Sequence, residues 1–301
     1  MMDLSEYRTK IDEIDRQLVA LFTERMATAA DIAAYKKAHH LPVLDAARER
    51  QKLRQIAELA PAALQNETQT LYRLLLALSR SYQSRLLGPV SPLPAEIEKA
   101  ISDTPQLFPA RAAIACQGVE GAYSQLACER LFCTPEISYF PDLDAVFAAV
   151  DESLCRYAVV PLESSAVYDL MMRHNFRIVR NVRLKPDRCP TSAVGEGSSE
   201  SAQGGNSTRF LCISKQLEIY PGADRTSLMM TLPREPGALA DVLSCLSALG
   251  ISLGRLESRA ACTFYFELES PVSSPQFLQC MEELGKISEG CSYLGSYSEV
   301  V

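Results

Sequence analysis

The chain has 301 residues, enough for two or three domains that each have a hydrophobic core. Hydrophobic residues make up 47% and charged residues 22%, which is typical of globular proteins. The formal net charge of −7 argues against a general nucleic-acid or acidic-membrane binder. The charge is uneven, because residues 1–88 hold 13 Lys+Arg against 11 Asp+Glu, so this segment is slightly basic.

The N-terminal sequence "MMDLSEYRTK" has no apolar stretch behind a basic start, so we expect no signal peptide. No apolar run approaches the 18 or so residues that a membrane helix needs. The ten cysteines stand singly, without a CxxC pair or histidines at zinc spacing. We therefore expect a cytoplasmic protein with reduced thiols, no metal and no cofactor.

Residues 4–37 carry apolar residues every three or four positions with no Pro or Gly between them, which predicts one helix about 50 Å long. The segment "LPVLDA" ends it, and Asp45 can cap a second helix that runs to about residue 60. Residues 68–87 predict a third helix. A monomer of this size cannot cover so long a helix, so we expect an all-α module that dimerises.

The predicted helices carry eight polar residues of interest: Arg8, Arg25, Lys36, Asp45, Arg48, Glu49, Ser79 and Gln83. Arg25 and Lys36 are about three helical turns apart and share one face, whereas Arg8 is turned roughly 100° from Arg25. Arg8 is therefore better placed to serve a partner's pocket. Each residue alone is compatible with a solvated surface, but together they suit a small dicarboxylate that carries an ether and a hydroxyl.

The segments "YRTKIDEIDRQLVALFTERMATAADIAAYKK", "LPVLDAARERQ" and "LSRSYQ" resemble the all-helical chorismate mutases across residues 4–88. All eight polar residues stand where that family binds substrate. The resemblance implies that chorismate is converted to prephenate in an intertwined homodimer, in which Arg8 crosses into the neighbouring site.

The implied reaction is an intramolecular [3,3] rearrangement, so it needs a compact substrate conformer and stabilised charge on the ether oxygen rather than an acid or base. The expected roles are a carboxylate clamp, donors to the ether oxygen and groups that hold the ring hydroxyl. The clamp comprises Arg8 of the partner subunit, Arg25 and Arg48, assisted by Ser79; the donors are Lys36 and Gln83; and the hydroxyl is held by Glu49 and Asp45.

Residues 89–108 are Pro-rich and then amphipathic, which predicts a linker with a short helix. Strand and helix patterns alternate after it, which predicts an α/β unit with a parallel sheet. Gly118 and Gly121 in "QGVEGAYS" either let backbone N–H groups approach an anion or form a plain tight turn.

With "VYDLMMRHNFRIVRNVRLK" and "NSTRFLCIS", residues 109–215 resemble prephenate dehydratase, a two-lobed, periplasmic-binding-protein-like α/β enzyme often fused behind this mutase. The resemblance implies that Thr208 is the acid that helps hydroxide leave as prephenate becomes phenylpyruvate. Arg209 and Phe210 would shape the same pocket.

The chain departs from that family in two places. The loop in "PLESSAVYDL" is short, with Ser164 where the family has Asn. Sixteen Gly/Ser-rich residues, 190–205, replace a whole second lobe, and this composition predicts a flexible connector. Because a cleft enzyme with one wall missing cannot exclude water, we expect impaired dehydratase activity; a fully active bifunctional enzyme is the alternative.

Residues 222–301 predict strand, helix, two strands, helix, strand, a ferredoxin-like α+β domain. Its segments "EPGALADVL" and "GISLGRLESRA" resemble the ACT regulatory domain, which binds phenylalanine at a dimer interface. The implied effector residues are Gly237, Ala238, Leu239, Glu257, Ser258 and Arg259. Since the family usually has Pro after Arg259 and a longer hairpin, a domain that only dimerises is the alternative.

Two classes of protein therefore compete. One is an enzyme of the phenylalanine pathway with the substrates chorismate and prephenate, L-phenylalanine as effector, and at least a homodimeric state. The other is a non-catalytic protein that binds aromatic amino acids. The complete set from Arg8 to Gln83 favours the enzyme, because loss of catalysis would have broken some of these positions.

Overall fold

The computed structural model describes residues 3–87, 91–162, 165–184, 208–235, 237–260 and 262–300. Ser164 and the predicted connector 190–205 lie outside the described residues. The chain divides into two compact units. The first comprises residues 1–92, 235–250 and 279–287, and the second comprises residues 93–234, 251–278 and 288–301.

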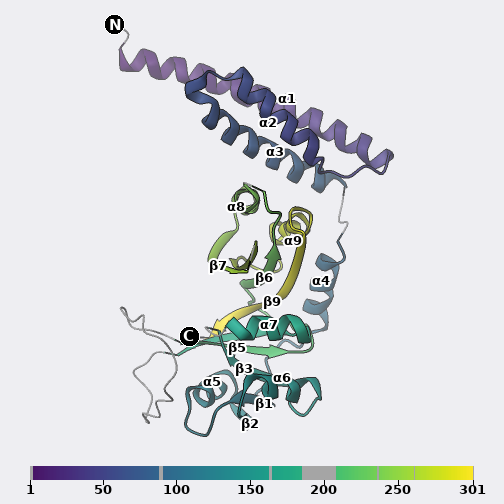
Figure 1. Ribbon diagram of the computed structural model, residues 1–301, viewed down its shortest axis with the longest axis vertical. Helices are drawn as coiled ribbons and strands as arrows, with labels where there is room; N and C mark the ends of the chain where they lie inside the picture. Colours follow the sequence, from purple (N-terminus) through teal and green to yellow (C-terminus); the bar gives the residue numbers. More distant parts are fainter. Residues whose placement is uncertain are drawn as a thin grey trace. The chain divides into compact units, whose positions relative to one another are not determined.

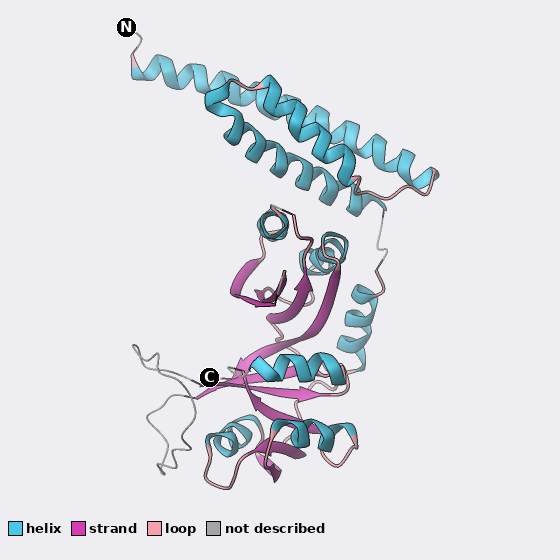
Figure 2. Ribbon diagram, viewed as in Figure 1, coloured by secondary structure: helices cyan, strands magenta, loops and turns pink. Residues whose placement is uncertain are grey.

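The first unit begins with helices only, since described residues 3–87 contain no strand (Figure 2). Helix α1 spans Leu4–Ala38, α2 spans Ala46–Leu59 and α3 spans Gln65–Leu87, with a short 3-10 turn, η1, at Ala62–Leu64. Helices α1 and α2 both pack on α3 (Figure 1). Asp3 and Glu6 form a capping box at the start of α1. Asp45 caps α2 by accepting the Arg48 N–H at 3.0 Å, at the predicted boundary.

Helix α1 leaves a row of large apolar side chains uncovered within one chain. They follow each other at alternate spacings of three and four residues, the repeat of a coiled-coil seam. We call this row the α1 stripe: Leu4, Tyr7, Ile11, Ile14, Leu18 and Leu21, each between 47% and 62% exposed. The first unit is completed by α8 (Ala238–Ala248), which packs on α3, and by the end of α9 (Pro275–Ile287).

The second unit contains a sheet of nine described strands in the order β2-β1-β3-β5-β4-β9-β6-β8-β7. The first part of the unit runs α4 (Leu93–Asp103), β1 (Arg111–Gln117), α5 (Tyr123–Leu131), β2 (Thr134–Phe140), α6 (Leu143–Asp151), β3 (Tyr157–Pro161), α7 (Ser165–His174), β4 (Arg177–Leu184) and β5 (Thr208–Ser214). The later strands are β6 (Arg225–Thr231), β7 (Ser252–Ala260), β8 (Thr263–Glu269) and β9 (Gly290–Val300).

The expectation of a parallel sheet in the middle region is only partly right. Strands β1, β2 and β3 are parallel, but β5 is antiparallel to both β3 and β4. The chain leaves the sheet at Leu184 and re-enters it at the residue paired with Leu184, Thr208. A strand that re-enters at the end where its neighbour stopped must run in the opposite direction, and the sheet is therefore mixed.

Hydrophobic cores cover both faces of this sheet. Along β5, Leu211 and Ile213 join the core with α6 and α7, whereas Phe210 and Cys212 join the core with α5. This alternation is that of a strand covered on both faces.

The last eighty residues follow the predicted order β6-α8-β7-β8-α9-β9. Strand β9 is parallel to β4, with Arg180 opposite Ser298, so the strands of this region continue the sheet of the preceding α/β region. In the part of the chain that is described, no helix is both long and apolar enough to cross a membrane.

Candidate functional site

Helices α1, α2 and α3 surround a cavity of about 410 Å³, the three-helix pocket. Seven of the eight polar residues predicted from the sequence line it: Arg25, Lys36, Asp45, Arg48, Glu49, Ser79 and Gln83. Arg8 is not among the lining residues and is exposed on α1. The helical spacing that separates Arg8 from Arg25 explains this division.

One end of the pocket is organised by Arg25 on α1. Its guanidinium donates to the Ser79 hydroxyl and, at 3.1 Å, to the carbonyl of Leu75. The Ser79 hydroxyl in turn donates to the Met26 sulfur at 3.7 Å. These bonds fix the planar guanidinium, the group that pairs best with a carboxylate.

Lys36, near the end of α1, is held by the turn that follows the helix. Its ammonium donates to the carbonyl of Val43 at 2.5 Å. A lysine ammonium has three donors, so this bond leaves capacity for a ligand while it limits where the charge can lie.

Glu49 forms an ion pair with Arg80, a residue that the sequence analysis did not single out. The two side chains are only 23% and 16% exposed. The position of Arg80 directly after Ser79 did not indicate this ion pair, because the spacing of residues along one helix does not predict which carboxylate of another helix a cation will contact. The one available signal was general: a partly buried carboxylate such as Glu49 needs a cation beside it.

Gln83 lies deep in the wall of the pocket and is 7% exposed. Its amide oxygen is buried without a hydrogen-bond partner among the described residues. The Gln83 amide can be turned by 180° without changing its shape, so the side chain can offer either its oxygen or its N–H₂ group to a ligand. An unpaired buried amide is uncommon and points to a polar ligand.

The pocket is positively charged overall. Its cations outnumber its carboxylates by five to two: Arg25, Lys36, Arg48, Lys52 and Arg80 against Asp45 and Glu49. The apolar part of the lining, which the sequence analysis missed, includes Ile32, Val43 and Leu76. This combination suits a compact dianion with an apolar ring face.

Thr208 is the first residue of β5 and is partly buried. It lies on the same face of the sheet as Phe210, the face that α5 covers. Because β5 runs antiparallel to β3 and pairs Phe210 with Pro161, Thr208 lies at the edge where β1 and β3 end. Open α/β sheets bind ligands at the carboxyl ends of their strands.

The Gly118–Gly121 segment lies at the same edge and forms a tight turn. Both glycines have positive φ, 115° and 87°. The Gly118 N–H donates to the carbonyl of Phe140 at 3.0 Å, and the Gly121 N–H donates to the Gln125 side chain at 2.7 Å. Since both N–H groups are satisfied internally, these contacts favour the turn over an anion site.

Arg209 points to the opposite face from Thr208, since neighbouring residues of a strand alternate. Its guanidinium lies 3.2 Å from both carboxylate oxygens of Glu267 on β8. Burial opposes the charge, but the adjacent Glu267 raises the pKa of Arg209 above its usual value. Arg209 therefore forms an ion pair on the opposite face of the sheet and does not line the face on which Thr208 lies.

The six residues expected at an effector site fall into two groups. In the second unit, the Arg259 guanidinium lies over the Tyr168 ring at 4.3 Å and donates to Glu257 at 2.5 Å. Ser258, between them on β7, is exposed and points to the other face.

Gly237, Ala238 and Leu239 belong to the first unit and begin α8. Gly237 is the left-handed N-cap, with φ of 99°. This left-handed φ favours glycine, and a Cβ there would also lie 2.5 Å from the end of the Arg73 side chain, which would have to move.

Comparison with known protein families finds two matches, in the order predicted from the sequence. Residues 7–84 match the family described as chorismate mutase type II, and residues 114–189 match prephenate dehydratase. The chain therefore combines two enzyme domains, a chorismate mutase domain of the isomerase class and a prephenate dehydratase domain of the lyase class.

Relatives that join the same two domains cover almost the whole chain. The bifunctional chorismate mutase/prephenate dehydratase of Escherichia coli (strain K12) is 24% identical over 381 residues, which span 96% of this chain and 95% of the relative. The Stutzerimonas stutzeri protein of that name is 24% identical over 384 residues, 99% of this chain and 98% of its own. The chain is therefore similar, in its two domains and their order, to these bifunctional proteins.

Solved structures show a related fold for the later part of the chain. Prephenate dehydratase from Arthrobacter aurescens in complex with L-Phe is 19% identical and superimposes with a TM-score of 0.51, covering 62% of this chain and 90% of its own. GqqA, described as a novel type of quorum-quenching acylase, is 24% identical with the same TM-score and covers 62% and 94%.

Proposed function

We propose that residues 3–87 catalyse the rearrangement of chorismate to prephenate in phenylalanine biosynthesis. The observation that carries this proposal is the three-helix pocket, in which seven predicted polar residues from three helices line one cationic cavity. Arg25 and Arg48 bind the substrate carboxylates, and Ser79 holds Arg25 in place. Asp45 and Glu49 accept from the ring hydroxyl.

The rate enhancement comes from Lys36 and Gln83, which donate to the ether oxygen as the carbon–oxygen bond breaks. Both side chains are positioned before the reaction, since Lys36 is bound to the Val43 carbonyl and Gln83 is buried in the lining of the pocket. Preorganised donors of this type stabilise developing charge without reorganisation. The cationic lining also favours the conformer that brings the reacting ends together.

The test is the turnover of chorismate by the full chain and by Lys36→Ala. We expect kcat to fall about 10²- to 10³-fold, since one preorganised donor is removed. Lys37→Ala is the matched control, because Lys37 does not line the three-helix pocket. Wild-type kcat in Lys36→Ala would exclude the assigned role.

A homodimer would complete the site. The α1 stripe is an uncovered coiled-coil seam, and a second copy of the same helix is its simplest complement. The stripe shares its helix face with Arg25 and Lys36, because Leu18 is seven and eighteen residues away from them. A partner packed along this face would pass the three-helix pocket, where Arg8 of the partner subunit would add a third guanidinium to the clamp.

The prephenate dehydratase domain is proposed to be impaired. Its family match ends at residue 189, and the alignment with the Escherichia coli relative has at least 80 positions without a residue of this chain. Thr208 lies opposite Leu184 at the edge of the sheet where β1 and β3 end, and we infer from the sequence that the missing residues belong between these two residues. Without a second wall, the site would stay open to water.

L-Phenylalanine is the proposed effector of the C-terminal region. The prephenate dehydratase of Arthrobacter aurescens, which shares this fold, was solved in complex with L-Phe, and this supports the choice. Isothermal titration of the full chain with L-phenylalanine should give saturable heat. If neither heat nor a thermal shift is detected, the region is a dimerisation element instead.

A further inference from the structure

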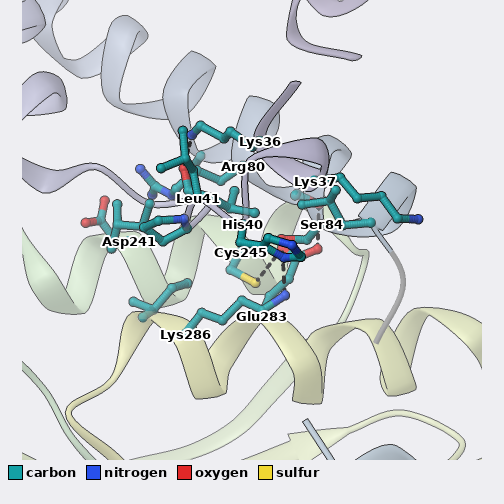
Figure 3. Close-up of a pocket in the computed structure, with 17 residues that line it drawn as sticks. Lys36, Lys37, His40, Leu41, Arg80, Ser84, Asp241, Cys245, Glu283 and Lys286 are labelled. Atoms are coloured by element: carbon teal, nitrogen blue, oxygen red, sulfur yellow. Dashed lines mark hydrogen bonds between the residues drawn. The ribbon is translucent and has the colours of Figure 1, made fainter. Parts of the chain in front are cut away.

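The first unit contains a second, larger cavity of about 690 Å³ (Figure 3). It is lined by the turn that follows α1, the second half of α3, helix α8 and the end of α9. We call it the α3/α8 pocket. Its volume lies within the range of small-molecule sites.

The lining combines an apolar wall with excess positive charge. The apolar residues are Leu41, Pro42, Val43, Leu44, Ala77, Leu87 and Ile287. The charged residues are four cations and two carboxylates, namely Lys36, Lys37, Arg80 and Lys286 against Asp241 and Glu283. Lys286 is also paired, at 2.9 Å, with Glu282, which does not line the pocket. An apolar molecule with one anionic group is complementary to such a lining.

The two carboxylates of the lining, Asp241 and Glu283, already interact with groups of the protein. Glu283 accepts from Ser81 at 2.8 Å, Gln279 at 2.6 Å and the Cys245 thiol at 3.4 Å. Burial raises the pKa of Asp241, although Arg80 and Arg73 act against this shift. These contacts reduce the negative potential that an incoming anion would meet.

Three residues, Lys36, Val43 and Arg80, line both the α3/α8 pocket and the three-helix pocket. Lys36 is bound to the Val43 carbonyl, and Arg80 is paired with Glu49 in the three-helix pocket. A carboxylate in the α3/α8 pocket would attract both cations. Its binding would therefore change the positions of groups assigned to the mutase reaction.

We propose that the α3/α8 pocket is a second binding site, that it takes an amphipathic monocarboxylate, and that its occupation slows the mutase. Binding itself is independent of the proposed function; only the effect on rate depends on it.

The binding test uses octanoate as the probe and octylammonium as its oppositely charged counterpart, titrated into the full chain by calorimetry. We expect saturable binding of octanoate only. Ile287→Glu places a negative charge on the partly exposed apolar wall and should weaken octanoate binding about tenfold or more. Ile287→Met keeps the wall apolar and should bind as the wild type does. Absence of saturable octanoate binding, or equal binding by Ile287→Glu, overturns the site.

The coupling test measures chorismate turnover with and without saturating octanoate. We expect octanoate to lower kcat about fivefold or more in the wild type, and to leave kcat of Ile287→Glu unchanged when it is compared with the rate of that variant without octanoate. Octanoate that binds without changing kcat or KM overturns the coupling. If the chain does not turn over chorismate at all, the proposed mutase function fails, while the calorimetric result on the site still stands.

Discussion

Arg80 shows how one residue can serve two roles within a small helical unit. It forms an ion pair with Glu49, and it borders both cavities of the first unit. Its sequence neighbours Ser79 and Gln83 could be recognised from motif and spacing, since both are set by the period of one helix. The contact of Arg80 with Glu49 joins α3 to α2 and depends on how those helices pack, which local sequence does not encode.

We predict that Arg80→Ala lowers kcat/KM for chorismate about 10- to 100-fold, because Glu49 would lose a charged hydrogen-bond partner in a half-buried setting. Arg80→Lys keeps the charge and should recover most of the loss. Steady-state kinetics of both variants are the measurement. Since Arg80 positions Glu49, we expect the effect mainly in kcat, with unchanged thermal stability in Arg80→Lys. Equal kcat/KM in Arg80→Ala and the wild type would contradict this role.

A buried cluster around Glu218 predicts a specific dependence of stability on pH. The hydroxyls of Tyr157 and Tyr220 donate to Glu218 at 2.7 and 2.6 Å. Burial, followed by the bond to Glu218, raises the pKa of Tyr220 to about 12. An unfolded tyrosine titrates near 10. Between these values the unfolded chain holds fewer protons than the folded one, so stability must fall as the pH rises.

Urea denaturation at pH 9 and pH 11 measures this effect. Tyr220 should account for about 1 kcal/mol of the loss in unfolding free energy between the two values. Tyr220→Phe should therefore show a smaller loss than the wild type. Tyr35→Phe is the control, because Tyr35 is 59% exposed, and it should lose as much as the wild type does. Equal pH dependence in all three proteins would show that Tyr220 does not resist ionisation.

At the scale of whole elements, the long first helix was the most predictable and the order of strands the least. Periodicity and the Asp45 cap placed α1 and α2 to within a residue or two, because both signals are local. The direction of β5 was missed, since it depends on pairing with β3 and β4 across a long separation in sequence. The same reason explains why the union of β4 with β9 was not foreseen.

The α1 stripe gives a prediction about assembly. Leu18→Glu places a charge in the centre of the row and should convert a dimer to a monomer in size-exclusion chromatography with light scattering. Mutase activity should fall with it if Arg8 of the partner subunit completes the site. Ala20→Glu adds the same charge about 200° around the helix and should leave both properties unchanged. A wild-type chain that is monomeric and fully active would exclude the proposed dimer.

At the scale of the molecule, the two enzyme domains differ in how far the residues predicted from the sequence come together. In the mutase domain, residues from three helices still converge on one pocket. In the dehydratase domain, Thr208 lies at a sheet edge while Arg209 is paired with Glu267 on β8. Sequence reasoning could propose Thr208 because its motif is local. The partner of Arg209 could not be found in this way, since it lies 58 residues further along the chain.

This difference predicts that the two activities separate in one protein. Incubation of the full chain with chorismate should accumulate prephenate, and incubation with prephenate should form phenylpyruvate no faster than the spontaneous reaction. Thr208→Ala is the comparison variant, because phenylpyruvate formation that depends on Thr208 would be lost in it. Equal, slow rates in both proteins would support an impaired dehydratase. Rapid phenylpyruvate formation that Thr208→Ala abolishes would instead require that the single lobe, or a second copy of the chain, closes the site around Thr208.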